Sequence, residues 1–240
     1  MKLFADFGNS RVKVDFYRGN SLHEVYCGPT ILHDIQAAVR TTAIDGGMWC
    51  TVHPLDSDIR EWMEGMGMKP LTASTPVPIR NGYSTPETRG MDRLAAAVGA
   101  WATDPGHNML VIDAGTAITY DFITSDGVFK GGNIAPGVAV RLNSLHEHTG
   151  ALPLVKPEGD VPLFGYDTTT AIRGGVLNGI RYEAEGYISE LEMLYPSLLV
   201  FLTGGDADFF DIKAKSRIFA LPDLVLRGLV RIVDYNEKGF

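Results

Sequence analysis

Two stretches of the chain, residues 2–17 and 108–123, show the same order of apolar and polar positions. Each begins with a short apolar run, turns at a glycine and continues into a second strand-like run. In both, an aspartate, Asp6 or Asp113, lies two positions before the glycine of the turn. Short apolar runs on both sides of such a turn are typical of β-hairpins. The pattern therefore predicts two hairpins with similar tips.

Helical and strand-like patterns alternate after each hairpin. Apolar residues recur at helical spacing in six segments. These predicted helices cover residues 31–42, 55–66, 91–102, 138–150, 168–195 and 224–235. Apolar runs at 46–52 and 197–205 predict strands between the helices, and 23–29 can add a third strand to the first hairpin. Strands that alternate with helices indicate an α/β fold.

The two halves of the chain share this order of elements, which indicates an internal duplication. A chain of 240 residues suits either one large domain or two of about 100 residues each. We therefore expect an N-terminal domain, 1–107, and a C-terminal domain, 108–240. Residues 70–90 are rich in Pro, Thr and Gly, which predicts a strand followed by an ordered loop. In the helix that follows, one apolar face is expected from Leu94, Ala97, Val98 and Trp101.

Composition excludes several classes of protein. Hydrophobic residues make up 45% of the chain and charged residues 21%, as in an ordinary globular protein. The net charge of −8, without a cluster of Lys and Arg longer than a pair, argues against a nucleic-acid-binding surface. Asp6 interrupts the stretch where a signal peptide needs apolar residues, and no membrane-spanning run is present, so we expect a cytoplasmic protein. Cys27 and Cys50 lack a CxxC spacing, and we expect reduced, buried thiols.

The tips of the two predicted hairpins have the chemistry of a phosphate site. Gly8 and its counterpart Gly115 allow a tight turn and a close approach of backbone to ligand. Asn9, Ser10 and Thr116 add polar donors beside backbone N–H groups that are free in such turns. A single Asp-x-Gly is most often a plain turn. Two copies, each between apolar strands at the start of a similar half, favour phosphate binding.

Three charged side chains lie next to these turns. Asp6 and Asp113 cannot hold phosphate directly, but a carboxylate can position a hydrated Mg²⁺ or another cation that bridges to it. For Asp6 we expect contact with Mg²⁺ through water. Lys13, on the second strand of the first hairpin, can reach the same phosphates as a point charge.

The two turns together resemble the actin-like, acetate and sugar kinase superfamily. That resemblance implies two ribonuclease-H-like domains, each with a phosphate-binding hairpin, and ATP in the cleft between them. The superfamily also has a glycine pair after a late strand, which packs against adenosine. Gly204 and Gly205 in "VFLTGGDA" match that pair. A helix cap is the alternative reading of such glycines.

Within that superfamily the chain resembles type III pantothenate kinase, which phosphorylates the primary hydroxyl of pantothenate at the start of coenzyme A synthesis. The likeness covers nearly the whole chain. It rests on "DFGNSRVK", "GYSTPETRGMDR", "DAGTAITYD", "GGNIAPG" and the "DTTTAIRGG" to "TGG" stretch. The family commonly has Thr in place of Ser10, and a Leu in place of Arg89. Arg89 adds a second cation near a site meant for a carboxylate, which could help or could alter substrate preference.

The family's Gly-x-Asp-Arg signature falls on Gly90, Met91, Asp92 and Arg93. At a helix start, Asp92 can accept the proton of the attacking alcohol, and Arg93 can bind a carboxylate through two parallel hydrogen bonds. The alternative is an ordinary N-terminal helix aspartate followed by a surface arginine.

The resemblance implies further contacts. Tyr83 would line the pantothenate pocket, and Thr168 would contact pantothenate, although Thr169 and Thr170 leave that register open by one or two positions. A monovalent cation, K⁺ or NH₄⁺, would bind near Asp113, with Thr116 facing the phosphates of Mg²⁺-ATP. The family commonly forms homodimers through its long helices. Two other functions stay open: a non-catalytic regulator of the same fold, and an actin-like kinase for another small hydroxy acid.

Overall fold

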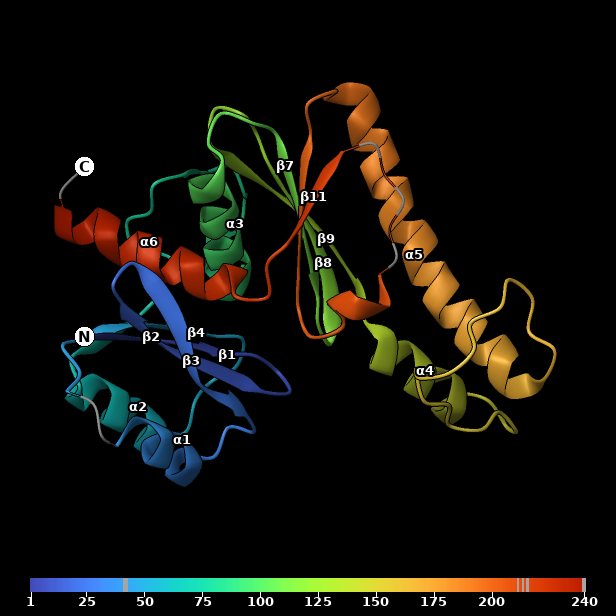
Figure 1. Cartoon of the computed structure of the whole chain (residues 1–240), viewed down its shortest axis with the longest axis horizontal. Coiled ribbons are helices and arrows are strands. Elements are labelled where there is room, and N and C mark those ends of the chain that lie inside the picture. The colour runs from blue at the N-terminus through green and yellow to red at the C-terminus, as the bar shows by residue number, and fades with distance from the viewer. Residues whose placement is uncertain (41–42, 211, 213, 215, 239–240) are drawn as a thin grey trace. The chain divides into compact units, whose positions relative to one another are not determined.

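The computed structural model describes residues 1–40, 43–210, 212, 214 and 216–238 (Figure 1). The α/β fold divides into two compact units. Unit 1 contains residues 1–106, 123–131 and 223–240, and unit 2 contains 107–122 and 132–222. The first boundary between the units, after residue 106, lies next to the expected domain boundary at 107. The division differs from the expected domains because residues 123–131 and 223–240 belong to unit 1.

Unit 1 is built on a five-stranded sheet with the order β3-β2-β1-β4-β5. Its strands are β1 Lys2–Phe7, β2 Val12–Arg18, β3 Ser21–Gly28, β4 Gly47–Thr51 and β5 Met68–Pro70. The expected hairpin is the antiparallel pair β1–β2, and the expected third strand is β3, antiparallel to β2. β4 pairs with β1 in parallel, as a crossover connection through a helix requires. Cys50 is buried in β4, whereas Cys27 is exposed on β3, which corrects the expectation of two buried thiols.

Four α-helices belong to unit 1. They are α1 Leu32–Val39, α2 Ser57–Gly65, α3 Met91–Thr103 and α6 Leu224–Lys238, with a 3-10 turn η1 at Pro86–Thr88. Residues 41–42, the expected end of the first helix, lie outside the described residues. α3 and α6 pack closely through glycine, since a Cβ atom on Gly228 would lie 1.8 Å from the carbonyl oxygen of Ala95.

This packing explains two departures from the sequence-based predictions. α6 closes over α3 and so belongs to unit 1, although it lies at the far end of the chain. α3 is buried continuously from Arg93 to Ala100 rather than along one apolar face. A helix that is covered on several sides needs small residues at its contacts, and α3 supplies three consecutive alanines from Ala95.

The second sheet has the strand order β11-β10-β7-β8-β9-β6. Its strands are β6 Arg80–Asn81, β7 Met109–Ala114, β8 Ala117–Ile123, β9 Val128–Pro136, β10 Leu199–Thr203 and β11 Arg217–Ala220. β10 pairs in parallel with both β7 and β11. The short β6 pairs with the start of β9 inside unit 1. Neither β6 nor β11 was predicted, because each is too short to show a hydrophobic period.

Two helices and a 3-10 turn complete unit 2: α4 Val138–Glu147, α5 Thr168–Leu194 and η2 Ala207–Phe209. The N-terminus of α5 has a capping box. The Asp167 carboxylate accepts from the N–H of Thr170, and the Thr170 hydroxyl accepts from the N–H of Asp167. Apolar residues of both helices join one core with β7, β8 and β10. None of the helices in the described part of the chain is long and apolar enough to cross a membrane.

Candidate active site

The first hairpin places the predicted phosphate residues of unit 1 together. Gly8 N–H donates to the carbonyl of Arg11 at 3.1 Å, which closes a tight turn between β1 and β2. Asn9 and Ser10 are exposed at its tip. Asp6 lies directly opposite Lys13 in the antiparallel register, so their side chains share one face of the sheet. The turn therefore presents exposed polar groups beside one carboxylate and one ammonium group.

Asp6 also lies near the carboxylate of the Gly-x-Asp-Arg segment. Burial and the negative charge of Asp92 raise the pKa of Asp6 from 3.8 to about 6, against the lowering effects of the Cys50 thiol and Lys13. The thiol of Cys50 donates to Asp6 Oδ1 at 3.4 Å from the adjacent strand β4. Two neighbouring carboxylates resist simultaneous ionisation unless a cation is present. The pair thus has the electrostatics of a cation site.

The start of α3 fixes the position of Asp92. Gly90 is the N-cap residue, and Asp92 lies in the first turn, where its Oδ1 accepts from the backbone N–H of Arg93 at 2.8 Å. A Cβ atom on Gly90 would lie 2.3 Å from that same Oδ1. Glycine is therefore required at position 90 for the carboxylate to take this orientation.

Arg93 is buried and packs against the predicted substrate residue Tyr83. Its guanidinium lies 5.7 Å from the centre of the Tyr83 ring. The Tyr83 ring in turn rests on Gly131, where a Cβ atom would approach within 2.4 Å. Phe129 completes the group, with its ring centre 6.2 Å from that of Tyr83 and 5.4 Å from the Arg89 guanidinium. Arg93 is thus not the surface arginine of the alternative reading, and Arg89 is buried beside it.

The second hairpin forms the corresponding turn of unit 2. Gly115 N–H donates to the carbonyl of Ala117 at 3.2 Å, and Thr116 is exposed at the tip. Gly137, which follows β9, donates from its N–H to the carbonyl of Thr116 at 2.9 Å. A Cβ atom there would lie 2.2 Å from the Gly115 oxygen. Asp113, the last residue but one of β7, lies opposite Thr203 of β10.

The glycine pair after β10 packs against this turn. Gly204 has a φ of +97°, and a Cβ atom there would lie 2.3 Å from the carbonyl oxygen of Ala114. The N–H of Asp206 donates to that oxygen at 2.9 Å. Gly205 is exposed between them. The structure therefore brings Gly204 and Asp206 against the second hairpin, and glycine at 204 is required by both its conformation and its contacts.

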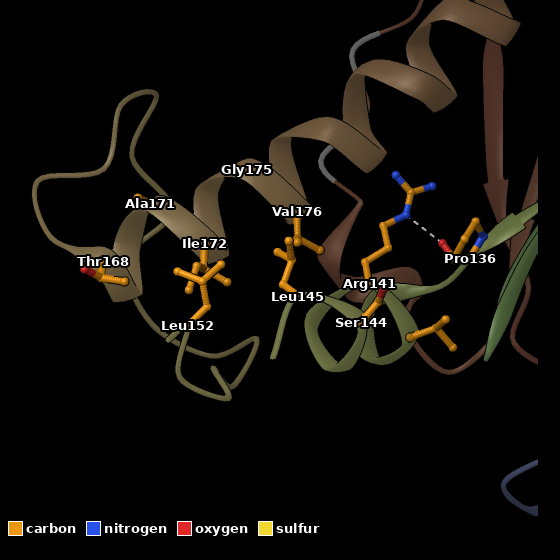
Figure 2. Close-up of a pocket in the computed structure, with 11 residues that line it drawn as sticks. Pro136, Arg141, Ser144, Leu145, Leu152, Thr168, Ala171, Ile172, Gly175 and Val176 are labelled. Atoms are coloured by element: carbon orange, nitrogen blue, oxygen red, sulfur yellow. Dashed lines mark hydrogen bonds between the residues drawn. The ribbon is translucent and has the colours of Figure 1, made fainter. Parts of the chain in front are cut away.

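Thr168 lies at the first position of α5, in a pocket of about 690 Å³ between α4 and α5 (Figure 2). The pocket is lined mainly by apolar side chains such as Leu145, Ile172 and Val176. Thr170 is buried and committed to the capping box, whereas Thr168 is exposed. Of these two threonines, Thr168 is therefore the one accessible to a ligand.

Sequence reasoning did not find two polar residues near these groups. Cys50 was considered as an isolated thiol, and only the parallel pairing of β4 with β1 brings it to Asp6. Arg141 lines the α4–α5 pocket and contacts the residue before Gly137, which no local motif indicates. The Cys50 contact depends on pairing between strands that are distant in the chain, whereas Arg141 and Pro136 are only five residues apart.

The donor set fits Mg²⁺ bound together with a phosphate ligand. The described residues contain no group of three or more His, Cys, Asp or Glu side chains that could enclose a metal by themselves. Mg²⁺ commonly uses one or two carboxylates, water and the oxygens of the substrate phosphates. Asp6 and Asp92 provide such carboxylates in unit 1.

Comparison with known proteins identifies the family. The model of the type III pantothenate kinase family matches residues 2–190. A type III pantothenate kinase of Phocaeicola vulgatus is 46% identical over 99% of this chain and all of that protein. Another, from Bacteroides fragilis, is 46% identical over 99% of each chain.

Solved structures support the fold. A Baf-family protein of Campylobacter jejuni, described as a transcriptional activator, matches 98% of this chain and 99% of its own with a TM-score of 0.61 and 21% identity. A ROK hexokinase from Thermus thermophilus matches 96% of this chain and 97% of its own with a TM-score of 0.51 and 15% identity. The fold is thus that of the sugar kinases with two actin-like domains. With a family model over most of its length and relatives at 46% identity, the chain belongs to the type III pantothenate kinase family.

Proposed function

We propose that this protein transfers the γ-phosphoryl group of ATP to the primary hydroxyl of pantothenate, giving 4′-phosphopantothenate and ADP as the first step of coenzyme A synthesis. The observation that carries the proposal is the grouping of Asp6, Lys13 and Asp92 in unit 1, with Gly90 shaping the position of the last. Two carboxylates beside an ammonium group suit phosphoryl transfer, in which positioning and charge stabilisation supply most of the rate.

In this mechanism Asp92 orients the hydroxyl of pantothenate and accepts its proton as the oxygen attacks the γ-phosphorus. Lys13, together with the polar tip formed by Gly8, Asn9 and Ser10, holds the phosphates from unit 1. Asp6 would hold Mg²⁺ through water, and the ion would supply charge neutralisation at the phosphates. Burial and the charge of Asp92 raise the pKa of Asp6, so a bound cation would favour its ionised carboxylate.

Unit 2 has nucleotide-binding residues of its own in this proposal. Thr116 faces the ATP phosphates, Gly204 and Gly205 pack against adenosine, and a monovalent cation, K⁺ or NH₄⁺, binds near Asp113. The support is that the Gly204 turn packs directly on the second hairpin. Replacing K⁺ by Na⁺ at equal ionic strength is expected to lower turnover; equal rates in both salts would remove the monovalent cation from the proposal.

The pantothenate site is formed from the Gly-x-Asp-Arg segment. Arg93, already stacked on Tyr83, binds the pantothenate carboxylate, and the backbone at Gly90 and Met91 lines the same site. Thr168 contributes a hydroxyl from the start of α5. Arg93 is buried on an aromatic ring, which holds its planar fork in place for a bidentate contact.

We also infer a cytoplasmic homodimer. Beside the α4–α5 pocket, the loop before α5 exposes Leu163 at 70% and Phe164 at 84%, an unusual display of large apolar side chains. A second copy of the chain that covers this surface would bury them. Light scattering coupled to size-exclusion chromatography should give twice the 26.1 kDa chain mass, and a monomer at micromolar concentration would contradict the dimer.

The test of the function is ADP release with ATP, Mg²⁺ and K⁺, measured for pantothenate and for a panel of other small hydroxy acids. Pantothenate should give the highest kcat/KM, and mass spectrometry should detect the phosphorylated product. A preferred substrate elsewhere in the panel would instead support a kinase for another hydroxy acid. Absence of turnover with every substrate would favour the non-catalytic regulator.

A further inference from the structure

Arg141 joins three segments of unit 2. Its Nη2 donates to Glu183 Oε2 of α5 at 2.7 Å, and its Nε donates to the carbonyl oxygen of Pro136 at 2.7 Å. Figure 2 shows the side chain rising from α4, with the bond to Pro136 drawn as a dashed line. The ion pair is mostly buried, with 22% of the Arg141 side chain and 28% of that of Glu183 exposed. An arginine can make both contacts at once because its donors form a rigid fork.

The residue that Arg141 holds lies beside the second hairpin. Pro136 ends β9 and precedes Gly137, the N-cap residue of α4. Gly137 donates from its N–H to the carbonyl of Thr116 and lies too close to Gly115 to tolerate a side chain. A shift of Pro136 would therefore be passed through Gly137 to the backbone of the hairpin tip.

The partner of Arg141, Glu183, lies in a largely buried setting. One buried oxygen of Glu183, Oε1, and the buried hydroxyl of Tyr120 have no hydrogen-bond partner in the part of the chain that the structure describes. Burial and the charge of Glu183 raise the pKa of Tyr120 above its ordinary range. The Tyr120 ring packs on Tyr187 with 4.4 Å between ring centres, and the Tyr187 hydroxyl accepts from Asn133 Nδ2 at 3.1 Å.

These contacts tie β8, β9 and α5 into one assembly around the Arg141–Glu183 pair. A buried charge without its partner is costly, so Glu183 strongly favours the position of Arg141 seen here. The guanidinium is thereby held where its Nε meets the Pro136 carbonyl.

We propose that Arg141 is a positioning residue for the nucleotide: anchored by Glu183, it holds Pro136–Gly137 and thereby sets the hairpin tip that receives the ATP phosphates. This inference rests on the proposed function, since it assumes that Gly115 and Thr116 face phosphate. Arg141 itself need not touch the ligand. Its removal should affect the nucleotide more than pantothenate, because Arg93 and Tyr83, assigned to pantothenate, lie in unit 1. Thr168 lines the same pocket as Arg141, but the hydrogen bonds of Arg141 described above go to Pro136 and Glu183.

Arg141→Lys tests the contact with Pro136 separately from the ion pair with Glu183. The ammonium at the end of a lysine can still pair with Glu183, but lysine has no donor at the position of Nε to hold Pro136. Isothermal titration with Mg²⁺-ADP should show affinity about 5- to 10-fold weaker than in the unaltered protein, the scale of one lost hydrogen bond. The KM for pantothenate should stay within about 2-fold, and the melting temperature should change little because the ion pair remains.

Two further variants serve as matched comparisons. Glu183→Gln keeps an oxygen that accepts from Arg141 Nη2, so nucleotide affinity should remain close to that of the unaltered protein. Arg181→Lys alters an arginine of α5 that contacts Tyr182 and Asn178. This variant should change neither the affinity for Mg²⁺-ADP nor the KM for pantothenate.

Unchanged Mg²⁺-ADP affinity in a folded Arg141→Lys protein would overturn the inference, as would equal losses for nucleotide and pantothenate. If that variant does not fold, Glu183→Ala releases the guanidinium from α5 and should show the same selective loss of nucleotide affinity. An unaltered protein that binds no Mg²⁺-ADP would instead refute the proposed function itself. Normal binding and turnover in the unaltered protein with no effect of Arg141 would refute only the positioning role.

Discussion

At the scale of single residues, the site depends on glycines that admit neighbouring groups and on carboxylates with altered acidity. Gly90 makes room for the Asp92 carboxylate, and Gly131 makes room for the Tyr83 ring. Asp6 has its pKa raised by burial and by Asp92. The sequence indicated the residue types in these groups, but not that Asp6 and Asp92 lie near each other, because their proximity depends on how α3 packs against the sheet.

Gly90→Ala tests how the glycine shapes the position of the Asp92 carboxylate, the proposed general base. The added Cβ atom would lie 2.3 Å from Asp92 Oδ1, so the carboxylate must turn away. We expect turnover to fall by roughly 100-fold, the cost of a misplacement of about 1 Å at a reacting group. Steady-state kinetics would measure it, with Gly65→Ala in α2, where a Cβ atom meets nothing within 4 Å, as the control. Wild-type turnover in Gly90→Ala would show that the orientation of Asp92 does not depend on the glycine.

Asp15 gives a prediction about stability. It is buried in β2, where burial, followed by Glu24 and Asp223, raises its pKa to about 6, despite the opposing charges of Lys13 and His23. A folded-state pKa above the ordinary 3.8 means that the folded protein binds more protons than the unfolded chain between these values. The contribution of Asp15 to the free energy of unfolding therefore falls as the pH rises from 4 to 6, and stays low above 6.

Asp15→Asn removes this ionisation. The variant should be more stable than the unaltered protein by roughly 1–2 kcal/mol at pH 8 and little different at pH 4. Urea unfolding at the two pH values measures the difference. A variant that loses the same stability at both would indicate that Asp15 contributes a contact rather than an unfavourable buried charge.

At the scale of elements, most strands and helices were predictable because each has a clear period of its own. The two hairpins, the crossover strands β4 and β10, and all six α-helices follow the apolar pattern within a few residues. The return of α6 to unit 1 was not predictable, because it depends on the fit of Gly228 against Ala95 across more than a hundred residues. The contact of Arg141 with Glu183 was not predictable either, since local periodicity does not show which residues of two helices face each other.

Gly228→Ala tests the packing of α6 on α3. In an open helix, alanine stabilises relative to glycine by roughly 0.5–1 kcal/mol. Here the methyl group would overlap the Ala95 carbonyl, and we expect a loss of about 1–3 kcal/mol in the free energy of unfolding from overpacking. Gly179→Ala in α5, which has open space at the Cβ position, is the matched control and should stabilise. If both variants stabilise alike, α3 and α6 are not in close contact.

At the scale of the whole molecule, the two Asp-x-Gly hairpins lie in different units and have different surroundings. The first is accompanied by Lys13 and by the segment with Asp92. The second is packed by Gly137 and by the Gly204 turn. The two hairpins are therefore alike in their turns, whereas the residues packed around them differ.

In the proposed mechanism, Asp92 activates the hydroxyl of pantothenate at a site that binds ATP independently of this carboxylate. The most direct measurement is single-turnover formation of 4′-phosphopantothenate by Asp92→Asn, alongside Mg²⁺-ATP binding and the control Asp58→Asn, which alters an exposed aspartate in the first turn of α2. We predict a rate roughly 100-fold lower or more for Asp92→Asn, with nearly unchanged ATP affinity and no loss in the control. A rate for Asp92→Asn equal to that of the unaltered enzyme would show that Asp92 does not activate the hydroxyl.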